Sequence, residues 1–92
     1  MNLLRELRRI KAELRYNNIS FAYFKQCLRL LNHFIKLEDY HSAYCLANDI
    51  KNSKVILSNE LDKIEYLNQI GKLSNIIDEL ESKIYTNKVH IR

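Results

Sequence analysis

The cysteines and histidines of this 92-residue sequence, whose side chains can bind a metal or take part in catalysis, are Cys27, Cys45, His33, His41 and His90. Nucleophilic catalysis needs a Ser or Cys beside a base that a third group orients. A zinc site needs Cys and His at close, regular spacing. The two cysteines form no CxxC pair, and the three histidines fall on separate predicted elements. The sequence therefore predicts neither an enzyme nor a metal site, and we expect no cofactor.

The cysteines and the first residues also bear on where the protein works. Cys27 and Cys45 are interpreted as small hydrophobic residues that fill helix contacts, as free cysteines commonly do. The first fifteen residues are charged throughout, unlike a signal peptide, and no apolar run approaches the roughly 20 residues needed to span a bilayer. We therefore expect a reduced, cytoplasmic protein that does not insert into a membrane.

Positive charge is concentrated in the first third of the chain. Residues 1–36 hold eight Lys or Arg and two Glu, whereas residues 37–92 hold seven Lys or Arg and nine acidic residues. Such a segment can neutralise phosphates, so a small basic nucleic-acid-binding or regulatory protein is an alternative. Glu6 and Glu13 weigh against nucleic acid, because they can pair with nearby arginines on a solvated helix face. The basic residues of the first 16 are Arg5, Arg8, Arg9, Lys11 and Arg15.

The composition restricts the fold that must position these residues. The chain has one Gly and no Pro. An all-β fold of this size would need several tight turns built from residues with special backbone geometry. The apolar fraction of 47% is that of a folded protein. We therefore expect an all-α fold, with residues 1–92 in a single domain.

Apolar residues recur at intervals of three and four, which predicts about five antiparallel helices. Their approximate ranges are 2–16, 20–36, 39–51, 54–70 and 73–86. Gly71 is expected to close the fourth helix as a left-handed cap. The third helix has a narrow stripe of small residues that suits close packing, and the fourth has a longer apolar stripe that includes Leu61, Ile64 and Leu67.

A shift of 33 residues brings four sets of apolar residues into register, which predicts a degenerate helical repeat. The predicted partial unit spans residues 1–17, unit one spans 19–52 and unit two spans 53–87. The four sets are Leu4, Leu37 and Ile70; Leu7, Tyr40 and Leu73; Ile10, Ala43 and Ile76; and Leu14, Ala47 and Leu80.

The period and the turn resemble the tetratricopeptide (TPR) family. Cys27, Leu30, Leu31 and Phe34 stand at first-helix positions of that pattern, and the turn that begins at Glu38 reads EDYHSA. The family's usual small residues are replaced by Leu31, Ile64 and Ile76, and its closing Pro by Val55. The resemblance therefore implies TPR-like helix pairs that pack less closely than in standard arrays.

In TPR-like arrays the first helix of each unit lines a concave groove. Leu28, Ile35 and Leu61 would be apolar there without an intramolecular partner, as a site for an amphipathic helix requires. The alternative is that helices 1 and 5 cover these residues, which are then ordinary core. The groove positions that the resemblance implies are Lys25, Leu28, Asn32, Ile35, Lys36, Ser58, Leu61, Glu65, Asn68 and Gln69.

Over about residues 19–85 the stretches LEDYHSAYCLA and EYLNQIGKL resemble the TPR-like chaperone of needle subunits in bacterial type III secretion systems. The resemblance implies a heterotrimer with a small helical co-chaperone and the needle subunit. The chaperone would hold the subunit's C-terminal amphipathic helix in its groove and so prevent polymerisation in the cytosol. A self-associating helical bundle is a further alternative. The co-chaperone contacts that the resemblance implies are Leu3, Leu4, Leu7 and Phe21.

Overall fold

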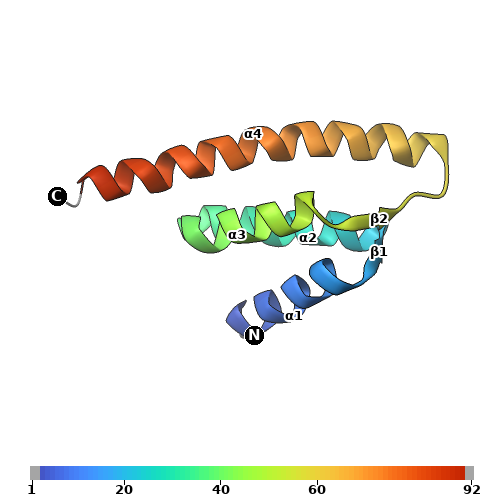
Figure 1. Ribbon diagram of the computed structural model, residues 1–92, viewed down its shortest axis with the longest axis horizontal. Helices are drawn as coiled ribbons and strands as arrows, with labels where there is room; N and C mark the ends of the chain where they lie inside the picture. The colour runs from blue at the N-terminus through green and yellow to red at the C-terminus, as the bar shows by residue number, and fades with distance from the viewer. Residues whose placement is uncertain (1–2, 91–92) are drawn as a thin grey trace.

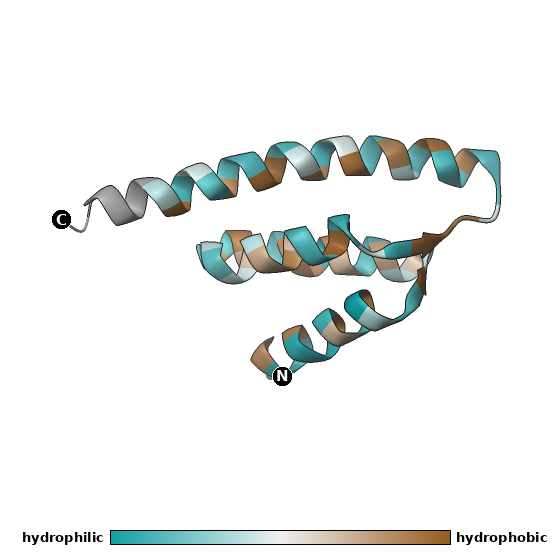
Figure 2. Cartoon of the chain, in the orientation of Figure 1, coloured by the Kyte–Doolittle hydropathy of each residue, from teal (hydrophilic) through white to brown (hydrophobic). Residues whose placement is uncertain are grey.

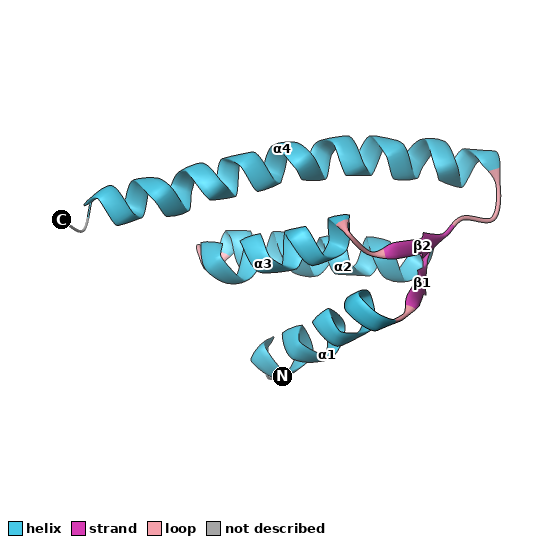
Figure 3. Ribbon diagram, in the orientation of Figure 1, coloured by secondary structure: helices cyan, strands magenta, loops and turns pink. Residues whose placement is uncertain are grey.

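The computed structural model describes the backbone of residues 3–90 and the side chains of residues 3–85. Figures 1 and 3 show helices joined by short connections, with two brief strands between them. The expected all-α class is confirmed. In order, the elements are α1 (Leu3–Tyr16), β1 (Asn18–Ser20), α2 (Phe21–Lys36), α3 (Tyr40–Lys51), β2 (Lys54–Ile56) and α4 (Glu60–His90).

Polar side chains fix where three of the helices begin. The Ser20 hydroxyl accepts a hydrogen bond from the Tyr23 backbone N–H at 3.1 Å, and the Asp39 carboxylate accepts one from the third residue of α3 at 3.3 Å. Asn59 caps α4 in the same way, by accepting from the Asp62 N–H at 2.9 Å. Each cap satisfies a backbone donor that has no partner within its helix.

The helices are arranged around α3, which packs against α1, α2 and α4. In Figure 1 the long α4 runs along one side of the α2–α3 pair, and α1 lies on the other side. Ala43, Leu46, Ala47 and Ile50 of α3 have no exposed surface, so the centre of the core is here. The predicted small-residue stripe on residues 39–51 is thus confirmed as a packing surface.

The two strands form a parallel pair that sequence patterning missed. Ile19 lies opposite Val55, so the strands pair residues 36 positions apart, which differs from the predicted offset of 33. Residues 54–56 are therefore extended rather than the start of a helix, and their backbone groups bond to β1. The same offset of 36 relates the buried residues of α1 to those of α3: Leu7, Ile10 and Leu14 to Ala43, Leu46 and Ile50.

The predicted break at Gly71 is wrong, because α4 continues through it as one helix of 31 residues. Gly71 does not have a positive φ and caps nothing. Consequently the predicted helices 54–70 and 73–86 are one element, and the described chain has four helices rather than about five. Unit two is a strand followed by a single helix, not a helix pair. The side of α4 that faces the core carries Tyr66, Ile70, Leu73, Ile77 and Leu80, on both sides of Gly71.

Replacing Gly71 with Ala should stabilise the protein by about 0.5–1 kcal/mol, because Ala restricts the unfolded backbone and favours the helix. A Cβ at this position meets nothing within 4 Å. The measurement is the free energy of unfolding in urea, with Ser82→Ala as the control at another exposed position of α4. A Gly71→Ala variant less stable than wild type would indicate a left-handed residue and contradict the continuous helix.

Candidate helix-binding site

The structure brings together α2 and the N-terminal part of α4, the two segments that the predicted groove requires. The Lys25 Nζ lies 3.6 Å from a Glu65 carboxylate oxygen. Beside this ion pair, the rings of Phe24 and Tyr66 are tilted by 54° with their centroids 5.2 Å apart. Because both side chains of the ion pair are about half exposed, it contributes little stability, and the ring contact adds to the packing that both helices make against α3.

The three apolar residues predicted for the groove differ in their surroundings. Leu28 and Ile35 are half-buried and pack against the core, so the expectation that they lack an intramolecular partner is wrong. Leu61 has 78% of its surface exposed, as expected for a binding residue. Of the polar groove positions, Asn32, Lys36, Ser58 and Asn68 are exposed and Gln69 is half-buried.

A second apolar face on α4 places Leu61 among residues that the groove prediction omitted. Ile64 is 57% exposed and Leu67 is 66% exposed, and three-residue spacing puts them on the same side of the helix as Leu61. We call these three residues the outer stripe. They face away from the core-facing residues of α4, and Figure 2 shows apolar segments recurring along this helix. The sequence could have predicted this second face, because α4 has more apolar residues than one helix face can hold.

The predicted co-chaperone contacts are divided between core and surface. Leu7 and Phe21 are buried, which is incompatible with a contact in the folded chain. Leu4 is exposed, and Leu3 lines a cleft of about 350 Å³ between α1 and α2. The wall of this cleft also carries the half-buried Tyr23, whose buried hydroxyl has no hydrogen-bond partner among the described residues.

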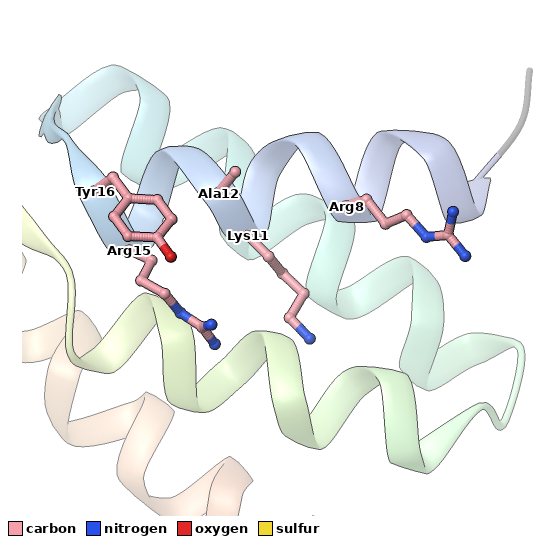
Figure 4. A pocket seen from close by; sticks show the side chains of 5 residues that line it. All are labelled: Arg8, Lys11, Ala12, Arg15 and Tyr16. Atoms are coloured by element: carbon pink, nitrogen blue, oxygen red, sulfur yellow. The ribbon is translucent and has the colours of Figure 1, made fainter.

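Three basic side chains project from α1 near α3; Arg8 and Arg15 are exposed, and Lys11 is half-buried (Figure 4). We call Arg8, Lys11 and Arg15 the basic face; with Ala12 and Tyr16 they line a shallow cleft of about 260 Å³. The nearest acid is Asp49, 3.9 Å from the Arg15 guanidinium. The acids of α1 itself are engaged elsewhere, since Glu6 pairs with Arg9 and Glu13 accepts a hydrogen bond from Asn17. The expected Glu–Arg pairing is thus confirmed for Glu6 only.

The cysteines and histidines form no cluster in the described part of the chain. No group of three His, Cys, Asp or Glu side chains there has the geometry to hold a metal ion. Cys27 is buried, and burial raises the pKa of its thiol to about 11, whereas Cys45 is exposed. The side chain of His90 lies outside the described residues. Among the described helices, none combines the length and apolar character needed to cross a membrane.

Comparison with protein-family models, with curated proteins and with solved structures found no match for this chain. The candidate site therefore depends on the geometry of its own residues.

The two thiols should differ sharply in reactivity, because the thiolate is the reactive form and burial disfavours it at Cys27. At pH 8 a thiol reagent should modify one group per folded chain, and Cys45→Ser should leave none. The modification of Cys27 in the folded chain should stay slow at pH 8, because nearly all of its thiol is protonated so far below a pKa of about 11. Modification of folded Cys45→Ser as fast as in denaturant would contradict the burial of Cys27.

Proposed function

We propose that this protein is a type III secretion chaperone that binds a small co-chaperone and sequesters the C-terminal amphipathic helix of the needle subunit in the cytoplasm. The observation that supports this proposal is the exposure of the outer stripe. Three large aliphatic side chains exposed in a row along two turns of α4 leave a surface that only another apolar surface can cover.

The polar residues around the outer stripe suit a helical partner. Asn68 lies one turn from Ile64, and Glu65 lies one turn from Leu61, so amide and carboxylate groups flank the apolar row. An amphipathic helix would bury its apolar residues on the stripe and satisfy its polar edge with these groups. The Glu65 carboxylate is also 3.6 Å from the Lys25 Nζ, so this edge of the stripe carries both a cation and an anion.

Sequestration follows from the chemistry of a filament subunit. A subunit that polymerises through an amphipathic helix would assemble prematurely if that helix stayed free, and covering the helix blocks assembly. The exposed Leu4 and the cleft wall at Leu3 are the accessible parts of the surface proposed for the co-chaperone. These features support protein binding rather than catalysis.

Replacing Ile64 with Asp should reduce capture of the needle subunit by at least about tenfold, because a carboxylate would be desolvated at the interface. The measurement is the amount of needle subunit that copurifies after co-expression with this chain and the co-chaperone. Circular dichroism should be unchanged, since Ile64 contacts little of its own chain.

Ser82→Asp provides the matched control, because Ser82 is exposed farther along α4 and should leave capture intact. Leu28→Asp should instead lower helicity and stability, since Leu28 packs on the core. Undiminished capture by Ile64→Asp, or absence of any complex with the wild-type chain, would contradict the proposal.

A further inference from the structure

The basic face of α1 and the outer side of α4 carry opposite charges. The basic face belongs to α1, which lies on the opposite side of the α2–α3 pair from α4 (Figure 1). Along α4, residues seven apart lie on the same side, so Ile64, Gly71 and Asp78 share one face. This face is apolar at its beginning and acidic farther on, where Asp78 and its neighbour Glu79 are both exposed. Within the described chain, neither of these two acids has an ion pair.

We propose that the basic face of one copy of this chain docks along the outer side of α4 in a second copy, head to tail. The cations would meet Asp78 and Glu79, while the aliphatic stems of the arginines and the exposed ring of Tyr16 would cover apolar surface of the outer stripe. The contact thus joins two different surfaces. In the resulting pair, one copy still has a free basic face and the other still has a free outer side of α4.

The dimensions of the two surfaces favour a second copy as the occupant. At 1.5 Å per residue, the segment from Arg8 to Tyr16 spans about 12 Å and that from Leu67 to Asp78 about 16 Å, a difference that long arginine side chains can bridge. Between the stripe and the acids lies Gly71, where an added Cβ would meet nothing within 4 Å, so a neighbouring helix can approach closely there.

A head-to-tail contact of this kind does not close on itself and generates chains of copies. The proposal does not depend on the identity of any other partner. A helix bound to the outer stripe would compete with the contact, so partner binding should convert chains of copies into defined complexes.

Sedimentation velocity of the purified chain, from roughly 10 µM to 1 mM, tests the proposal. The wild type should form a continuous series of oligomers, and the concentration needed should rise at least about tenfold between low and high salt. Two charge-reversal variants, Arg8→Glu/Arg15→Glu and Asp78→Lys/Glu79→Lys, should each be monomeric alone, with unchanged circular dichroism. Mixed together they should associate again, because each supplies the charge that the other has lost. Leu67→Asp should weaken association without removing its salt dependence, because Leu67 is the exposed apolar residue at the start of the docked segment.

Three results would overturn the proposal. The first is a wild-type chain that stays monomeric over this range. The second is continued dimerisation of the α1 variant alone, which would indicate that α4 pairs with itself. The third is binding of a single-stranded oligonucleotide by the wild type in the absence of self-association, which would assign the basic face to nucleic acid.

Discussion

Packing around α3 is the constraint on which the other elements depend. Ala43 and Ala47 present almost no side chain, so two neighbouring helices can approach this face closely, and Leu46 and Ile50 fill the space that remains. A larger residue at either alanine would force the helices apart and separate the Phe24 and Tyr66 rings that join α2 to α4. The packing of α3 thus determines where α4 and its candidate site lie.

The length of α4 gives this small protein the exposed surface that we propose for binding. Only part of the helix is needed to cover α3, and the core-facing residues form a single row. The apolar residues on the other side of its first turns therefore have no role in the fold of the described chain. In a protein of this size, apolar surface that stays exposed lowers the free energy of unfolding. A partner that covers this surface would raise the free energy of unfolding again. Under the proposed function, partner binding would therefore stabilise the fold.

Sequence patterning was sufficient where local signals act alone. The range 20–36 was close to the observed α2 because Ser20 caps its start, and Asp39 marks the start of α3 in the same way. It failed where a distant contact decides. The local pattern predicts a helix at Val55 and Ile56. The structure makes them a strand because they pair with β1, whose residues lie 36 positions earlier in the chain. Gly71 read as a helix end because a lone Gly often is one, whereas tertiary packing on both sides of it keeps α4 continuous.

The candidate site was predictable only in part for a related reason. Leu61 was identified from a resemblance, but whether Leu28 and Ile35 face solvent or core depends on how α2 sits against α3, which periodicity does not determine. We propose that the outer stripe receives an amphipathic helix. Calorimetric titration with a synthetic peptide of the needle subunit's C-terminal helix tests it most directly. We expect one peptide to bind per chain, with a negative heat-capacity change from apolar burial. Absence of binding, or binding with no heat-capacity change, would contradict it.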